Sequence, residues 1–555
     1  MGKDYFFNQM QKYTFSVGEA FALTDEGDDN SYLVSNSDSV HAEVYAPEIN
    51  LYIEGSSDSI EKKTENIRRL YEIRATAYDL AQQTDLIAEI GRKVILISDA
   101  DQAPLCEELE KNGFTLRVVA PESVAEVSGS IGCWKVSVTS GRAHEVLEAD
   151  QVLWCGGPNA FTRRRGIHDP DKLGTAQTVA ALLADSENSS YTNFIKYNAS
   201  LCQYHHRRAS VCGHCADLCP TGAISKYGIL KELAIADIDC NGCGGCVGIC
   251  PTGAIDYAPL PRNAFQSISS FYKDRSALIL PGSIIKADLQ LNLHENVLPL
   301  FLENIDFLDE CHLLSLLQKS GYPIIIYTDT MSLIVKNVIS LLNDIFLKKY
   351  NRPAIFVCCN EMELSEVASR LSPFPEIIYD LDERSLGKRE IFAKRLAHLV
   401  GKDDFGSVAT GPYLHYGSIH IDEERCTLCL SCADACNTGA LKVYAEDNTL
   451  RYTPALCTVC GYCESTCPES NCLHIEKDLL GLRPDFFRQK VMATDEIFNC
   501  VECGKGFAPA KAVNKIAAMM QPLFGEDHVR IKSLYCCPDC KAKLMLESVR
   551  IENTL

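Results

Sequence analysis

Eight cysteines in two regular runs between residues 426 and 467 constrain the fold more than any other feature of the sequence. The first run is Cys426-x2-Cys429-x2-Cys432-x3-Cys436, and the second is Cys457-x2-Cys460-x2-Cys463-x3-Cys467-Pro468. Three thiolates at this spacing surround one face of a [4Fe-4S] cube, and the fourth corner is bound by a cysteine of the other run. The spacing therefore predicts two [4Fe-4S] clusters. One would be held by Cys426, Cys429, Cys432 and Cys467, and the other by Cys457, Cys460, Cys463 and Cys436.

A pair of zinc knuckles is the alternative, but each run offers a third cysteine at a spacing that tetrahedral zinc does not require. Residues 406–480 resemble the two-cluster ferredoxin domain, and the resemblance implies an α+β ferredoxin fold for this module. One departure is Asn437, which stands where a proline usually follows the fourth cysteine. That change alters a turn and leaves the ligands in place.

A second module of the same kind is expected at residues 196–262, with one irregular run. Its complete run is Cys240-x2-Cys243-x2-Cys246-x3-Cys250-Pro251, whereas the partner run, Cys212-x2-Cys215-x3-Cys219-Pro220, has Ala209 where the first thiolate belongs. By the same exchange of fourth ligands, one cluster would be held by Cys240, Cys243, Cys246 and Cys219. The other has Cys212, Cys215 and Cys250, and we predict Cys202 as its fourth ligand. A [3Fe-4S] cluster, or ligation by His205 or His206, is the alternative.

An internal repeat supports this pairing of runs. Three cysteines are followed by nearly the same turn, at 219–224, 250–255 and 436–441, where Thr-Gly-Ala precedes Ile or Leu. The fourth copy, Cys467-Pro-Glu-Ser-Asn-Cys472, has diverged, and we interpret Cys472 as a spare thiol.

The segments around the modules have the rhythm of α/β domains. In the N-terminal region, 1–195, apolar residues at helical spacing predict one long helix or two from Ser59 to about Ile90, and strands at 93–98 and 115–119 flank a helix at 104–113. No G-x-G-x-x-G follows the first strand, which favours a scaffold over a nucleotide site. In the spacer, 263–405, strands at 277–280, 323–327 and 354–358 alternate with helices at 308–319 and 331–349.

Two smaller features remain open at this stage. Arg163, Arg164 and Arg165 form the strongest basic spot of the first two hundred residues, and a solvated loop or a docking site for an acidic group would explain it. Cys358 and Cys359 follow a predicted strand, at the end where doubly wound sheets place ligands. A structural role and a redox-active pair are both compatible with that position.

The tail, 481–555, carries two further Cys-x2-Cys pairs, Cys500 with Cys503 and Cys537 with Cys540. Two such pairs presented from separate turns make a tetrahedral S4 site, so we expect a zinc-ribbon-like tail with one zinc ion. Rubredoxin-type iron is the alternative metal, and Cys536 is an adjacent alternative ligand.

Composition bounds the compartment and the partners. The chain has 555 residues, 28 cysteines and a formal net charge of −21. Cysteines grouped at ligand spacing need a reducing compartment, and no stretch approaches the length of a transmembrane helix, so we expect a cytoplasmic protein without membrane insertion. The negative charge disfavours nucleic acid and favours redox partners that carry a basic docking patch.

The order of modules resembles the large 4Fe-4S ferredoxin-type proteins that accompany bacterial formate dehydrogenases. Only the cysteine motifs carry this resemblance, with Arg207 and Arg208 in the basic stretch between Cys202 and Cys212. It implies electron transfer to or from a formate dehydrogenase by a multidomain α/β protein into which two ferredoxin modules are inserted. The alternatives are an accessory or maturation factor for such an enzyme, and the iron-sulfur subunit of a heterodisulfide-reductase-like complex.

Overall fold

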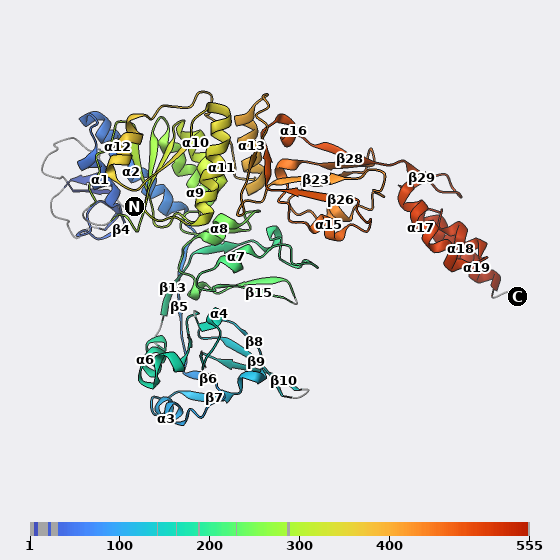
Figure 1. The fold of residues 1–555 in the computed structure, drawn as a ribbon, viewed down its shortest axis with the longest axis horizontal. Coiled ribbons are helices and arrows are strands. Elements are labelled where there is room, and N and C mark those ends of the chain that lie inside the picture. Colours follow the sequence, from blue (N-terminus) through green and yellow to red (C-terminus); the bar gives the residue numbers. More distant parts are fainter. Residues whose placement is uncertain are drawn as a thin grey trace. The chain divides into compact units, whose positions relative to one another are not determined.

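The structure is a computed structural model with a mixed α/β architecture (Figure 1). It describes residues 5–8, 20–23, 31–140, 143–162, 164–186, 189–228, 230–285 and 289–552. The chain divides into two compact units. The first comprises Met1–Arg208, Gly213–Phe346 and Arg352–Arg384, and the second comprises Ala209–Cys212, Leu347–Asn351 and Ser385–Leu555.

The N-terminal part of the first unit contains the predicted βαβ arrangement. Strands β6 (Lys93–Ile97) and β7 (Thr115–Val119) pair in parallel, and helix α3 (Ala103–Lys111) connects them. Strand β6 is an inner strand of the four-stranded sheet β12-β11-β6-β7, in which β11 is Gln151–Trp154 and β12 is Ile167–His168. This position explains its continuous run of buried aliphatic residues. This part of the sequence prediction is confirmed.

The helix predicted from residue 59 to about 90 is shorter in the structure. Helix α2 is Ile60–Leu80, with the Ser59 side chain capping its N-terminus, and Thr84–Ala88 forms strand β5. Strand β5 pairs with β13 (Ser189–Asn193) in an exposed antiparallel ribbon. The apolar residues of 84–88 fit either periodicity, and the pairing with a strand a hundred residues later decides between them.

The spacer is a parallel sheet, as its sequence rhythm predicts. The order is β19-β18-β20-β21, and all residues of β18 (Ser276–Pro281) are buried. Helices α10 (Glu310–Ser320) and α11 (Leu333–Tyr350) agree with the predicted helices, while strand β19 (Val297–Leu302) was not expected from the sequence. The other two strands are β20 (Ile324–Tyr327) and β21 (Ile355–Cys358).

Both cysteine-rich segments have the same strand and helix order. In each, the first strand pairs antiparallel with the last, and the two middle strands form a hairpin. One short helix lies between the first strand and the hairpin, and another lies between the hairpin and the last strand. In the first unit these elements are β14 (Ile195–Tyr197), α7 (His214–Leu218), β15 (Ile224–Tyr227), β16 (Glu232–Ile235), α8 (Gly245–Ile249) and β17 (Ile255–Tyr257). In the second unit they are β23 (Gly417–Ile421), α14 (Ser431–Asp434), β24 (Leu441–Tyr444), β25 (Thr449–Tyr452), α15 (Tyr462–Thr466) and β26 (Leu473–Lys477).

The described part of the tail begins with helix α16 (Pro484–Phe487) and strand β28 (Lys490–Thr494), and a hairpin and three more helices follow (Figure 1). Strands β29 (Ile497–Asn499) and β30 (Gly506–Pro509) pair antiparallel, and helices α17 (Ala510–Phe524), α18 (His528–Ser533) and α19 (Pro538–Glu552) follow. Among the helices that the structure describes, none combines the length and the apolar character needed to cross a bilayer.

Candidate metal centres

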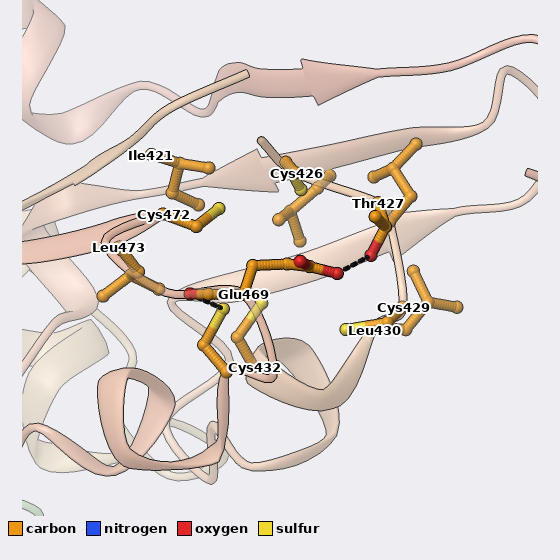
Figure 2. Close-up of a pocket in the computed structure, with 12 residues that line it drawn as sticks. Ile421, Cys426, Thr427, Cys429, Leu430, Cys432, Glu469, Cys472 and Leu473 are labelled. Carbon is orange, nitrogen blue, oxygen red and sulfur yellow. Dashed lines mark hydrogen bonds between the residues drawn. The ribbon is translucent and has the colours of Figure 1, made fainter. Parts of the chain in front are cut away.

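The first candidate site of the second unit is a pocket lined by the cysteines that the sequence assigned to one cluster (Figure 2). Cys426, Cys429 and Cys432 lie on the loop before and at the start of α14, and Cys467 reaches the same pocket from the second run. Burial, followed by the charges of the other three thiols, raises the pKa of Cys432 to about 12. The structure therefore brings together cysteines from both runs, as the exchange of fourth ligands requires.

The second site of this unit is formed in the same way. Burial and then the charges of Cys457, Cys460 and Cys436 raise the pKa of the Cys463 thiol. Cys436, at the end of the first run, is thus a neighbour of the three thiols of the second run. Four neighbouring thiolates repel one another unless a cationic core compensates their charge, so this donor set fits an iron-sulfur cluster.

In the first unit the complete run is assembled with its predicted fourth ligand. Burial and then the thiols of Cys215, Cys240, Cys243 and Cys219 raise the pKa of Cys246. The loop before α8 has a positive φ of 81° at Gly244, and a Cβ atom there would lie 2.7 Å from the Phe307 Cβ of the spacer. Glycine is required at this position by both its conformation and its close packing.

Cys202 has the local structure of a first ligand. It follows the 3₁₀ turn Ala199–Leu201, just as Cys457 follows the 3₁₀ turn Pro454–Leu456. The backbone N–H of Tyr204 donates to the Cys202 sulfur at 3.4 Å, and the N–H of Val459 donates to the Cys457 sulfur at 3.3 Å. This equivalence supports Cys202 as the missing ligand.

Three cysteines of the irregular site, Cys202, Cys215 and Cys250, lie in the first compact unit. Cys202, Cys215 and Cys250 all raise the pKa of Tyr197 through their charge, after the larger effect of burial. Cys212 lies in the segment Ala209–Cys212, which belongs to the second unit. Ligation by Cys212 and Cys202 therefore stays a prediction from the sequence.

The two histidines considered as alternative ligands form a group with Glu232. Their rings stack with centroids 3.9 Å apart, and His206 Nε2 lies 2.6 Å from Glu232 Oε1. The ligand atoms of His205, His206 and Glu232 all lie within 4.8 Å of one another. The contact with Glu232 disfavours His206 as the cluster ligand, while the buried position of Cys202 and the Tyr204 N–H donated to its sulfur favour Cys202.

Two tyrosine hydroxyls test whether the sites suit a sulfur-rich group. The hydroxyl oxygens of Tyr197 and Tyr452 are buried and have no hydrogen-bond partner of ordinary geometry among the described residues. Each tyrosine precedes a first-position cysteine by five residues, and the charge of that cysteine adds to burial in raising the tyrosine pKa. A hydrogen bond to that cysteine also raises each tyrosine pKa, so both hydroxyls place a donor at a predicted ligand sulfur, which fits a site that binds a sulfur-rich group.

Cys472 is a pocket residue whose position the sequence did not reveal. It is 2% exposed and lines the same pocket as Cys426 and Cys467. The signal that could have found it is the length of the fourth turn of the internal repeat, which has one residue more than the other three.

The tail brings its two cysteine pairs together. The sulfur atoms of Cys500, Cys503, Cys537 and Cys540 lie within 4.8 Å of one another, which a single metal ion requires. Burial opposes ionisation of Cys500, but backbone N–H groups, first that of Cys537, lower its pKa to about 6. These four cysteines can bind a metal ion.

The tail differs from a ribbon in its second half. The first cysteine pair lies on the turn after β29, where the N–H of Gly504 donates to the Cys500 carbonyl at 2.9 Å, but the second pair begins helix α19. Cys536 donates to the carbonyl of Lys532 at 3.4 Å and is not a member of the four-sulfur group.

The arginine run at 163–165 and the cysteine pair Cys358 and Cys359 are the remaining candidates from the sequence. Arg164 is buried and paired with Asp239 at 3.0 Å, so the expected solvated loop is wrong for this residue; Arg163 lies outside the described residues. Cys358 ends β21 with its pKa raised to about 11 by burial, then by Glu363 and Cys359, which weakens it as a nucleophile. Cys359 is exposed, and its backbone N–H donates to Glu363 at 2.8 Å.

Comparison with known proteins agrees with these sites. Two family models match, both described as a 4Fe-4S dicluster domain, at residues 208–254 and 418–468. No curated protein matches the chain. The chain therefore contains two 4Fe-4S dicluster domains of the ferredoxin type. The first match begins after Cys202 and includes seven of the eight expected cysteines, which is the irregularity that the spacing showed.

Proposed function

We propose that this protein transfers single electrons through four [4Fe-4S] clusters, to or from a larger oxidoreductase. One observation carries the proposal: in both dicluster domains, cysteines of one run lie among the thiols of the other, which supports an exchange of fourth ligands between two clusters. When bound, such clusters accept and release one electron at a time.

The residues of the chain bind the clusters and tune them. The predicted ligand sets supply four thiolates to each cluster, which leaves no open iron corner for bond-making chemistry. Backbone N–H groups two residues after Cys202 and Cys457 donate to their sulfur atoms, and Cys246 and Cys250 of the first module are buried from solvent. Hydrogen bonds to sulfur and solvent exposure are the features through which a protein sets cluster potentials.

The finer proposal concerns partner, compartment and tail. The order of modules suggests a formate dehydrogenase as the redox partner, and the net charge of −21 favours docking through a basic patch on that enzyme. We place the protein in the cytoplasm because cysteines that serve as metal ligands need a reducing environment. We assign zinc to the tail, since four sulfur ligands suit it, with rubredoxin-type iron as the competing ion.

The decisive experiment counts metals on protein purified without air. Four cubanes predict about 16 iron and 16 sulfide per chain, together with about one zinc. Iron near 12, or a [3Fe-4S] EPR signal that persists without air, would contradict ligation by Cys202, while absence of iron would overturn the proposed function.

A second measurement separates electron transfer from an accessory role. The reduced protein is mixed with a formate dehydrogenase, and reoxidation of the clusters is followed by absorbance. Rapid reoxidation supports the proposal, whereas stable binding to the immature enzyme without electron exchange would favour a maturation factor.

A further inference from the structure

We infer that Cys472 is an alternative ligand of the cluster site formed by Cys426, Cys429, Cys432 and Cys467, able to bind the iron corner assigned to Cys467. The inference rests on the proposed function, because it concerns a site that is proposed to hold a [4Fe-4S] cluster. It assigns a role to a fifth thiol that the four-ligand pattern does not use.

Backbone hydrogen bonds identify which position Cys472 occupies in the repeated turn. In three copies of the turn the carbonyl of an alanine accepts an N–H at 2.8 Å. The donor is the residue directly after the partner strand: Ala236 donates to Ala223, Asn198 to Ala254, and Thr453 to Ala440. In the fourth copy the carbonyl that accepts at 2.8 Å, from the N–H of Asp422, is that of Cys472. Cys472 therefore replaces the alanine of the other three copies.

The residue before each of these positions supports the alignment. Gly222, Gly253 and Gly439 have φ values of 70°, 71° and 66°, and Asn471, which precedes Cys472, has a φ of 55°. The fourth turn thus keeps a residue in the left-handed conformation, but the stretch from Cys467 to Asn471 is one residue longer than the stretch from Cys219 to Gly222. Asparagine tolerates this conformation better than most other residues with a side chain.

The alanine position is buried in each copy, and in the fourth copy the thiol placed there lines the pocket. Ala223, Ala254 and Ala440 are between 1% and 3% exposed, and Cys472 is 2% exposed. The Cys472 sulfur lies close enough to those of Cys426 and Cys467 to hydrogen-bond with both. Figure 2 shows it turned toward Cys426 on the wall of the pocket, and its thiol donates to the Asp422 carbonyl at 3.6 Å.

The exchange of one thiolate for another balances without a redox partner. With a cluster bound, the Cys472 thiol would release a proton to solvent and its sulfur would bind iron, while the iron–sulfur bond to Cys467 would break and Cys467 would take up a proton. No electron is gained or lost. Such an exchange would retain the cluster when Cys467 is lost, and no equivalent thiol is available to the neighbouring site, where Ala440 follows Cys436.

Equivalent substitutions in the two halves of the module test the inference. Iron and sulfide are counted, with EPR of the reduced state, in the full chain carrying Cys467→Ala, Cys436→Ala, Cys467→Ala with Cys472→Ala, or Cys472→Ala alone. We expect Cys467→Ala to keep the wild-type iron content, and Cys436→Ala and the double variant each to lose between one and about four irons per chain. Cys472→Ala should keep all its iron, because alanine is the residue of the other three copies.

The outcomes separate this inference from the proposed function. If the wild-type chain binds its iron but Cys467→Ala loses as much as the double variant, Cys472 is not an alternative ligand and the inference is overturned while the proposed function stands. If the wild-type chain holds no iron, the proposed function itself fails. A cluster retained in Cys467→Ala should also show an EPR spectrum shifted from wild type, since one ligand has changed position.

Discussion

At the scale of single residues, the two buried tyrosine hydroxyls are placed to influence cluster potential. Tyr197 and Tyr452 lie beside Cys202 and Cys457, and their hydroxyl groups have no other acceptor of ordinary geometry in the described chain. A hydrogen bond to cluster sulfur stabilises the reduced, more negative state and so raises the potential. We predict that Tyr452→Phe lowers the potential of its cluster by about 40 mV, the equivalent of ~1 kcal/mol for one electron.

Tyr197→Phe should lower the potential of the irregular cluster by a similar amount. Tyr272→Phe is the matched control, because the Tyr272 hydroxyl is equally buried but donates to the Pro299 carbonyl at 2.7 Å. EPR-monitored redox titration of the three variants provides the measurement. Equal potentials in all three and in wild type would show that the tyrosines do not donate to the clusters.

At the scale of elements, the buried pair of Arg164 and Asp239 ties the N-terminal α/β region to the first dicluster domain. Asp239 belongs to the 3₁₀ turn Asp237–Asp239 that precedes Cys240, and Arg164 also donates to the Gly129 carbonyl at 2.6 Å. Its guanidinium group lies 4.4 Å from the centre of the Trp134 ring. The pair therefore holds a ligand-bearing turn against a strand that is distant in sequence.

Removing the arginine should destabilise the protein in a pH-dependent way. Burial raises the pKa of Asp239, and Arg164 opposes that rise. In Arg164→Met the pKa of Asp239 rises further. The folded state then holds a buried carboxylate without its arginine partner at high pH, and a neutral carboxyl group at low pH. An aspartate whose pKa is higher in the folded than in the unfolded state favours folding only when the pH is low enough to protonate it. The loss in free energy of unfolding, about 3 kcal/mol at pH 8, should therefore shrink as the pH falls.

The first thermal transition, measured at pH 8 and pH 6, checks this expectation. Arg164→Met with Asp239→Asn is the control: it removes the charge, and its transition should be higher than that of Arg164→Met at pH 8 and insensitive to pH. A transition of Arg164→Met lowered equally at both pH values would mean that the arginine acts through packing on Trp134 and not through its charge.

At the scale of the whole molecule, the net charge of −21 should govern encounters with redox partners. Bound clusters add further negative charge, so cationic acceptors are attracted over distances set by the ionic strength. We predict that reduced protein transfers electrons to cytochrome c, a cationic acceptor, about tenfold more slowly at 0.15 M than at 0.01 M salt. Stopped-flow absorbance gives the rates. Anionic ferricyanide is the control acceptor, and its reduction should not become slower as the salt concentration rises. Equal salt dependence for both acceptors would argue against electrostatic docking.

Local patterns in the sequence predicted much of this architecture. Cysteine spacing depends on a few neighbouring residues, so the runs at 240–250 and 426–467 identified the dicluster domains, and buried strands such as β6 and β18 were evident as aliphatic runs. The same locality caused the errors. Residues 84–88 fit helix or strand until β13 is known, and Arg164 appears solvated until Asp239, 75 residues away, is placed beside it.

The sequence by itself determined that the chain contains two dicluster domains and predicted which cysteines hold their clusters, because a cluster imposes its own ligand spacing on any chain that binds it. Only the tertiary structure decided what surrounds the ligands: the tyrosine hydroxyls beside Cys202 and Cys457, the Phe307 contact at Gly244, and the fifth thiol at Cys472. Those contacts depend on which strands pair and how closely they pack. Side chains brought together by such pairing are separated along the chain, so no local pattern records them.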